Sequence, residues 1–199
     1  MAANCCPAAK VLGDALGRRI SVVGCSGSGK TTLARHLARE LGCPHIELDA
    51  LYHQANWQPL QEDEFLKQVS KMLQPEHWVV EGNYSAVRQQ ILQHSDMVIW
   101  LDFPRATVMR QVILRTLKRL LTRAELWNGN RERWANLFRL DPRRSILAWT
   151  WTRHPVYRSR YSAEMKAAPP SQRYIRLGSH AETEQFLNSL SVQVPVRRT

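Results

Sequence analysis

The sequence predicts an α/β fold in which helices cover both faces of a parallel sheet. Short segments rich in β-branched and apolar residues alternate along the chain with longer segments that have a helical hydrophobic period. One short segment, the expected strand at 97–102, is apolar up to its last residue, as is typical of a strand covered on both sides. Strands that alternate with helices run parallel, because each helix returns the chain to the same edge of the sheet.

Each expected element has a local signal. Strands are expected at residues 19–23, 45–49, 78–81, 97–102 and 173–177. Helices are expected after Lys30 to residue 41, at 62–73, from about 84 to 94, from about 104 to 123 and at 181–190, with a loop at 50–60. The first helix is indicated by the spacing of Leu33, Leu37 and Leu41, and Pro104 opens the fourth at a position that favours proline.

The chain has the length of one domain. Its 199 residues are 44% hydrophobic, which is enough for a packed core. We expect a flexible leader at 1–17, one domain at 18–190 and a tail at 191–199. The cysteines lack the paired spacing of a zinc site and are Cys5, Cys6, Cys25 and Cys43. With no long apolar run, we expect a reduced, cytoplasmic protein without a membrane partner.

The net charge of +11 is concentrated in one part of the chain. Residues 105–160 hold 14 Lys and Arg against 3 Asp and Glu, whereas the rest of the chain is balanced. Such a segment favours phosphate, whether on a nucleotide, on a substrate or in a nucleic acid. The alternative is a solvated basic helix face.

A phosphate-binding loop follows the first strand. The pattern G-x-x-x-x-G-K-[ST] is matched by Gly24, Cys25, Ser26, Gly27, Ser28, Gly29, Lys30 and Thr31. An expected strand precedes the motif and an expected helix follows it, as the motif requires. The alternative, an ordinary glycine-rich turn, does not account for this context. We therefore expect these residues, together with Thr32, to bind ATP.

The chemistry of the loop explains its residue types. Glycines let successive backbone N–H groups point inward at phosphate oxygens, and the helix that begins there turns its positive end to the same anion. Lys30 reaches the β- and γ-phosphates, and the Thr31 hydroxyl is a ligand for Mg²⁺. The sequence thus predicts ATP and Mg²⁺ as cofactors. Cys25 is expected to pack rather than react.

Three features together resemble the adenylate kinase-like P-loop kinases. They are the early phosphate-binding loop, the Glu81-Gly82 step after the third strand, and the run 101–104 before an arginine-bearing helix. Within that family the chain is most similar to the group labelled DNA topology modulation proteins, over about residues 18–190. The resemblance implies a three-layer P-loop NTPase fold with a five-stranded parallel sheet. It also implies an acceptor-binding segment at 50–75 and a helical, arginine-rich lid at 124–160.

The resemblance also suggests roles for three acidic residues. Asp49 ends the second expected strand, where similar kinases hold or deprotonate an acceptor hydroxyl; the alternative is a helix cap or loop carboxylate. Glu81 resembles the acidic residue that acts on Mg²⁺ through water; the alternative is a salt bridge at the strand end. Asp102 could be a Walker-B-like acid, but we expect it to cap the helix that Pro104 opens.

Arginines on the fourth helix are candidates for phosphate binding. Arg115, Arg119 and Arg123 recur every four residues and so share one helix face. Arg115 fits the family spacing, and with Arg119 it is expected to contact phosphate or, for Arg115, the nucleotide base. A second family arginine falls at Gln111, with Arg110 one position away. Arg88 is expected either to contact the acceptor or to lie at the surface.

The chain departs from adenylate kinases in two places. Where they carry a Gly-Phe-Pro-Arg run, this chain has Gly82-Asn83-Tyr84-Ser85, which argues against simple AMP kinase activity. The lid holds four tryptophans among five arginines, namely Trp127, Trp134, Trp149 and Trp151 among Arg131, Arg133, Arg139, Arg143 and Arg144. We expect these tryptophans to form a small packed core rather than platforms for bases.

The predicted function is transfer of the ATP γ-phosphoryl group to a nucleotide or another small hydroxyl or phosphate acceptor. One alternative is a nucleic-acid-associated ATPase that uses the basic segment 105–160. Another is a nucleotide-binding regulator without turnover. The sequence names neither the acceptor nor the oligomeric state.

Overall fold

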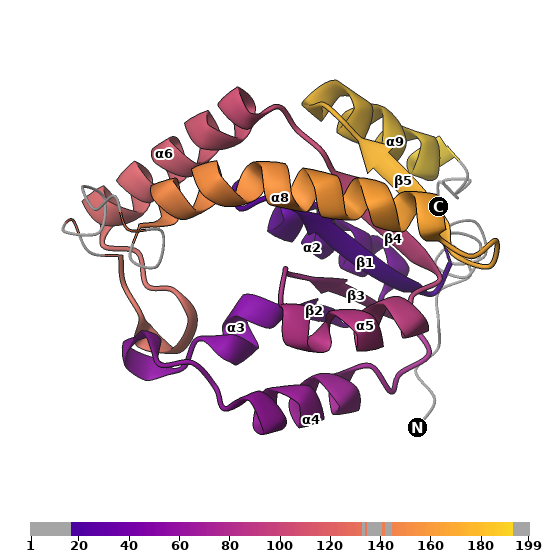
Figure 1. Cartoon of the computed structure of the whole chain (residues 1–199), viewed down its shortest axis with the longest axis horizontal. Helices are drawn as coiled ribbons and strands as arrows, with labels where there is room; N and C mark the ends of the chain where they lie inside the picture. The colour runs from indigo at the N-terminus through magenta and orange to yellow at the C-terminus, as the bar shows by residue number, and fades with distance from the viewer. Residues whose placement is uncertain (1–16, 133, 135–140, 142–144, 193–199) are drawn as a thin grey trace, which may run out of the picture.

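The computed structural model describes residues 17–132, 134, 141 and 145–192 (Figure 1). Its strands are β1 (Arg19–Gly24), β2 (His45–Glu47), β3 (Trp78–Glu81), β4 (Met97–Leu101) and β5 (Arg173–Leu177). Its α-helices are α2 (Lys30–Leu41), α3 (Leu48–Tyr52), α4 (Glu62–Met72), α5 (Ser85–His94), α6 (Arg105–Thr122), α8 (Ile146–Ala167) and α9 (His180–Val192). Two 3₁₀ turns are η1 (Ala55–Trp57) and η2 (Trp127–Gly129). The expected leader, up to residue 16, and most of the expected tail lie outside the described residues.

The five strands form one parallel sheet in the order β2-β3-β1-β4-β5. β1 is central, and Val22 pairs with Glu81 of β3 on one side and with Ile99 of β4 on the other. Figure 1 shows α8 and α5 in front of the sheet and α2 behind it. The expected five-stranded parallel sheet between helices is confirmed.

Two hydrophobic clusters hold the helices to the sheet. One joins β1 and β4 to α2, α6 and α8, and the other joins β2 and β3 to α3, α4 and α5. Val79 and Val80 are neighbours on β3, both are buried, and each belongs to a different cluster. Since successive strand residues face opposite ways, both faces of β3 are covered. Full burial of such a side chain contributes about 1.5–3 kcal/mol, so the central strands are firmly held.

The second strand is shorter than the sequence predicts. β2 ends at Glu47, and residues 48–52 form helix α3 where a strand end and a loop were expected. The reason lies in the sheet, because β2 pairs only with β3, and Glu47 is opposite the last residue of that strand, Glu81. Beyond Glu47 no partner strand remains, and the chain turns into a helix that carries Asp49 in its first turn.

The long helix α8 begins within segment 124–160, which was expected to be a helical lid, but it runs beyond that segment and packs into the core. Its buried positions are Thr150, His154, Tyr157 and Tyr161, spaced by four, three and four residues. This is a helical period, but it is built from hydroxyl, imidazole and phenol groups rather than aliphatic side chains. Three of the groups have partners: Thr150 Oγ1 donates to the Ile146 carbonyl, the His154 ring bonds the Phe103 carbonyl and Tyr161 donates to Asn83.

Two of the four lid tryptophans do not belong to the expected packed core. Trp134 and Trp151 are 49% and 52% exposed, and the Arg105 guanidinium lies 3.9 Å above the Trp151 ring. The arginines expected among them at 133, 139, 143 and 144 lie outside the described residues. None of the helices in the described part of the chain is long and apolar enough to cross a membrane.

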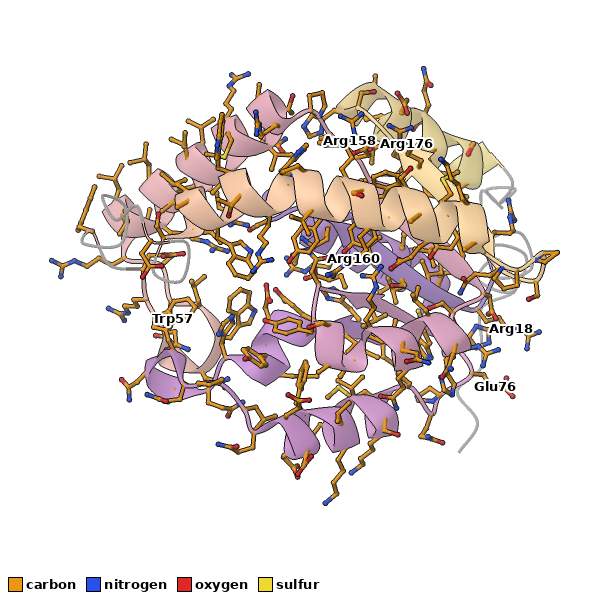
Figure 2. All side chains as sticks on the ribbon, viewed as in Figure 1. Arg18, Trp57, Glu76, Arg158, Arg160 and Arg176 are labelled. Atoms are coloured by element: carbon orange, nitrogen blue, oxygen red, sulfur yellow. The ribbon has the colours of Figure 1, made fainter. Side chains whose placement is uncertain are left out.

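Asp102 does not cap α6, as the sequence suggested. Pro104 is the capping residue, and no side chain bonds the first turn. The Asp102 carboxylate instead accepts a hydrogen bond of 2.8 Å from Arg176 Nε and lies 3.3 Å from Arg158 Nε. Figure 2 shows these two arginines beside each other above the sheet. Asp102 therefore ties β4 to β5 and α8.

Replacing Asp102 by Ser distinguishes the two roles. Serine caps helices as well as aspartate, so a capping residue would tolerate the change. Because Asp102 is an ion-pair partner, we expect Asp102→Ser and Asp102→Ala to lower the free energy of unfolding equally, by about 1–3 kcal/mol. Urea denaturation measures this, with the exposed Asp63→Ser as control. If Asp102→Ser kept the wild-type free energy of unfolding while Asp102→Ala did not, Asp102 would be a helix cap after all.

Candidate active site

The phosphate-binding loop has a backbone that only glycine permits at two positions. Gly24 has φ +147°, and a Cβ there would lie 2.7 Å from the Leu101 carbonyl oxygen. Gly27 has φ +84°, and a Cβ would lie 2.2 Å from a methyl of Val112 on α6. The loop therefore lies in close contact with both β4 and α6, and its backbone conformation requires both glycines.

Polar groups of the loop are available to an anion. Ser28 Oγ is buried without a hydrogen-bond partner among the described residues. Lys30 Nζ donates to the Cys25 carbonyl at 3.1 Å, which holds the ammonium across the loop. α2 begins at Lys30, and its N-terminus presents unpaired backbone N–H groups at the loop. This arrangement suits an anion such as a phosphate group.

Cys25 is a packing residue. It is 5% exposed, and its thiol lies 3.7 Å from the Thr150 carbonyl of α8. Burial raises the pKa of Cys25, with the opposing charge of Lys30 a smaller effect, so the thiolate is disfavoured.

A cavity of about 850 Å³ opens over the loop. Its lining includes eleven of the candidate site residues: Ser26, Gly27, Ser28, Gly29, Lys30, Thr31, Thr32, Asp49, Glu81, Arg115 and Arg119. Gly24 and Cys25 do not line it, since they face β4 and α8. Further lining residues were not predicted, among them Glu47, Trp127 and His180. One cavity thus brings together β-strand ends, α6, α9 and the segment around η2.

One end of the cavity suits a hard cation. Thr31 Oγ1 donates to Glu81 Oε1 at 2.8 Å. Burial raises the pKa of Glu81, and the nearby Lys30 charge opposes that rise. A hydroxyl and a carboxylate are the oxygen ligands that Mg²⁺ takes, and Mg²⁺ beside phosphates needs few protein ligands because water and phosphate complete its shell. In the described part of the chain no group of three His, Cys, Asp or Glu forms a metal cluster.

Asp49 is held by a tyrosine. The Tyr84 hydroxyl donates to Asp49 Oδ1 at 2.6 Å and lies 3.4 Å from His53 Nε2. Burial, and then the charge of Asp49, raises the pKa of Tyr84, so the phenol keeps its proton. Asp49 therefore lines the cavity in a fixed orientation.

The α6 arginines differ in their surroundings. Arg115 donates to Ser26 Oγ at 3.3 Å, and burial, followed by the nearby charge of Arg119, lowers its pKa. Arg119 lies 3.6 Å from Glu132. Arg123 follows the helix in a left-handed conformation with φ +48°, so it is not part of the helix face.

Arg88 lies away from the cavity. Its guanidinium pairs with Glu164 of α8 and lies 4.8 Å from the centre of the Tyr161 ring. Arg88 was expected either to contact the acceptor or to lie at the surface. It does neither, because it joins α5 to α8.

Asn83 is a residue that sequence reasoning noted without assigning a role. Its Nδ2 donates to the Gly24 carbonyl at 2.7 Å, and its Oδ1 accepts from Tyr161 at 2.7 Å. Burial raises the pKa of Tyr161 to about 12, so this donor is neutral at physiological pH. The departure from the adenylate kinase pattern at Gly82-Asn83-Tyr84 was the signal that could have found it.

Comparisons with known proteins agree with this geometry. A family model described as an AAA domain matches residues 20–139. The chain belongs to this AAA-domain family. The AAA-domain protein is 30% identical over 143 residues to a cytidylate kinase of Thermococcus kodakarensis, covering 61% of this chain and 72% of that one. To a cytidylate kinase of Pyrococcus abyssi it is 29% identical over 143 residues, covering 61% and 76%.

A solved structure shows the same fold. The shikimate kinase from Acinetobacter baumannii in complex with shikimate superposes with a TM-score of 0.52 and 17% identity, covering 95% of this chain and 99% of that one. At this identity the likeness concerns the fold alone. The phosphate-binding loop, the family match and the kinases among the relatives together show that the chain is a P-loop kinase. They do not identify its acceptor.

The buried Glu81 predicts a pH-dependent stability. Its folded pKa lies above the ordinary value of 4.5, so the native protein keeps a proton that the unfolded chain has already released. The free energy of unfolding therefore falls as pH rises from 4.5 through the raised pKa. Glu81→Gln has no side chain to ionise here, so its free energy of unfolding does not fall in this way. Without Mg²⁺ we therefore expect the variant to be more stable than wild type at pH 8.

Urea denaturation in EDTA at pH 4 and pH 8 measures the difference. The advantage of Glu81→Gln should vanish at about pH 4, where the native carboxyl is protonated. The exposed Glu62→Gln on α4 is the control. Equal free energies of unfolding for Glu81→Gln and wild type at pH 8 would mean that burial does not disfavour the charged form of Glu81.

Proposed function

We propose that the chain transfers the γ-phosphoryl group of Mg-ATP to a small acceptor whose reacting oxygen lies at Asp49. The observation that supports this most is that a single cavity is lined by Lys30, Thr31, Asp49, Glu81 and Arg115. Phosphate ligands, a place for a cation and a carboxylate for the acceptor thus share one space. Phosphoryl transfer depends mainly on such positioning and on charge stabilisation.

Each residue has a proposed part in binding ATP. The loop from Gly24 to Thr32 surrounds the phosphates with backbone N–H groups, and Lys30 turns from the Cys25 carbonyl toward the β- and γ-phosphates. Thr31 and Glu81 hold Mg²⁺. When bound, Mg²⁺ neutralises charge on the β- and γ-phosphates.

The transfer step conserves atoms and charge. The acceptor oxygen forms a bond to the γ-phosphorus, and the bond from that phosphorus to the bridging oxygen breaks, with its electron pair leaving on ADP. The acceptor proton passes to the Asp49 carboxylate, which Tyr84 orients. Arg115, and Arg119 beyond it, stabilise the charge on the phosphoryl group in transit.

We further propose that segment 50–75 binds the acceptor and that residues 124–132, the start of the expected lid 124–160, close over the site. From Ile146 onward the expected lid belongs to α8, which packs into the core. Glu125, Leu126 and Trp127 line the cavity, so the start of the proposed lid already borders the site. A lid that excludes water favours transfer to the acceptor over hydrolysis of ATP.

Lys30→Ala tests the donor side. Loss of the ammonium should reduce ATP-dependent phosphoryl transfer by at least about a hundredfold, while the circular dichroism spectrum and the unfolding midpoint stay near wild type. Loss of label from γ-labelled ATP measures turnover. Wild-type rates in this variant would remove Lys30 from the mechanism. ATP binding by the wild-type chain with no turnover would make it a nucleotide-binding regulator instead.

Arg115→Ala and Arg119→Ala test transition-state stabilisation. We expect Arg115→Ala to cost about 2–4 kcal/mol in kcat/KM, and Arg119→Ala less, because Arg119 is already paired with Glu132. Lys118→Ala is the matched control, since Lys118 is an exposed cation on the same helix. If all three variants keep the wild-type kcat/KM, the α6 cations do not act on the phosphoryl group.

A second candidate function is a nucleic-acid-associated ATPase, in line with the resemblance to the group labelled DNA topology modulation proteins. It is favoured by two cation–aromatic pairs that involve tryptophans of α8: Arg105 of α6 lies 3.9 Å from the Trp151 ring, and Arg153 lies 4.7 Å from the Trp149 ring. Such surfaces stack bases and contact phosphates. ATP hydrolysis that DNA stimulates, with a steep loss as salt rises, would support this candidate; hydrolysis indifferent to DNA would exclude it.

A further inference from the structure

We propose that the acceptor is a phosphate-free, polyhydroxylated compound of sugar-like character, bound between the carboxylates of Glu47 and Asp49 and the indole ring of Trp127. This inference rests on the proposed function and names the substrate class of the same site. It carries a definite chemical consequence: the product is a phosphate monoester and not a diphosphate.

The acceptor end of the cavity is acidic. Glu47, Asp49 and Glu81 all line it, and with Glu81 bonded to Thr31 on the cation side, Glu47 and Asp49 face the acceptor. Carboxylates accept hydrogen bonds from hydroxyl groups, and they repel a phosphate. An acceptor rich in hydroxyl groups and without a phosphate therefore matches this end.

An aromatic wall completes the acceptor end. Trp127 lines the cavity beside Glu47: burial raises the pKa of Glu47, and the nearby indole N–H of Trp127 lowers it. The His53 ring stacks on Trp127 with centroids 5.9 Å apart, and Trp57 packs edge-on against His53 at 5.3 Å. Trp57 is labelled in Figure 2, beside the segment that carries η2. An indole next to a carboxylate offers a sugar ring an apolar face and hydrogen-bond acceptors at once.

This wall is held in place by hydrogen bonds between segments far apart in the sequence. Asn128 Nδ2 donates to the His53 carbonyl at 2.6 Å. Asn130 accepts from the Trp57 backbone N–H and donates to the Gln54 carbonyl, both at 2.8 Å. Trp57 and Asn128 have φ of +60° and +55°, a conformation costly for residues other than glycine. The site is thus a built structure rather than a chance grouping of side chains.

Four of the described arginines each have an acidic or polar partner. Arg88 pairs with Glu164 of α8, and Arg115 bonds Ser26 in the phosphate-binding loop. Arg119 pairs with Glu132, and the charge of Arg35 acts on Glu47. The cations of the described cavity therefore serve the ATP side or offset a carboxylate. Cytidylate, which gives two relatives their name, carries a phosphate that this acceptor end does not favour.

Tyr84 leaves one Asp49 oxygen for the reaction. Its hydroxyl occupies Asp49 Oδ1, so Oδ2 is the atom that receives the proton of the acceptor hydroxyl. The acceptor oxygen then bonds to the γ-phosphorus, the bond to the bridging oxygen breaks, and ADP leaves with the electron pair. The products are ADP, a phosphate monoester and a protonated Asp49.

The test uses the full chain with Mg-ATP labelled on the γ-phosphate and a small-molecule extract of cells. Half of the extract is first treated with an immobilised phosphatase, which is then removed. We expect label transfer to both halves, and a product whose ³¹P signal shows no coupling to a second phosphorus. Cytidine and CMP serve as a defined pair, and CMP should not be phosphorylated.

Two other results are distinguishable. Loss of transfer after phosphatase treatment, or a product with coupled phosphorus signals, overturns the phosphate-free acceptor while the proposed kinase function stands. Hydrolysis of ATP with no transfer in either half defeats the proposed function, and this inference with it.

Variants locate the transfer at this wall. Asp49→Asn should lower kcat at least about a hundredfold, whereas Asp63→Asn, an exposed aspartate on α4, should not. Trp127→Ala should raise the acceptor KM about tenfold or more with kcat and the ATP KM little changed. The control is Trp134→Ala, since Trp134 is 49% exposed on the same stretch of chain. An unchanged acceptor KM in Trp127→Ala would remove the indole from the acceptor site.

Discussion

The parallel pairing of β1 with β3 and β4 determines the position of the groups around the phosphate-binding loop. Val22 lies opposite Glu81 and Ile99, so three strand ends reach one edge of the sheet together. The loop after β1 therefore begins beside the end of β3, and Thr31 can donate to Glu81. A slip of one residue in β3 would turn Glu81 to the opposite face and break this contact, because side chains alternate along a strand.

The same edge concentrates polar groups that the fold leaves incompletely satisfied. Arg115 Nε and Ser28 Oγ are buried without hydrogen-bond partners in the described part of the chain, and the Glu81 carboxyl group is buried beside them. Unpaired buried groups lower the stability of a protein. They persist here because an anionic ligand and a cation would satisfy them, so the arrangement that costs stability is the one that suits phosphoryl transfer.

The acceptor side depends on contacts between distant segments. Asn128 and Asn130 attach the chain around η2 to residues 50–57, which lie more than seventy positions earlier. A helix with a polar buried face, α8, closes the opposite side, and its Tyr161 reaches Asn83 and through it the loop. Side-chain hydrogen bonds consequently join the chain around η2 to residues 50–57, and they also join α8 to the loop.

The order of the strands, most of the helices and the phosphate-binding loop could be predicted from the sequence alone. Apolar runs, Gly24 to Thr31 and the leucine spacing of α2 are local signals, because backbone conformation over a few residues produces them. Asp102 was misassigned as a cap, and the end of β2 was placed too late, because both depend on a partner strand. Only the tertiary structure decided the surroundings of Asp49, since the hydrogen bond from Tyr84 spans 35 residues and no local pattern encodes which distant side chain the sheet order brings near.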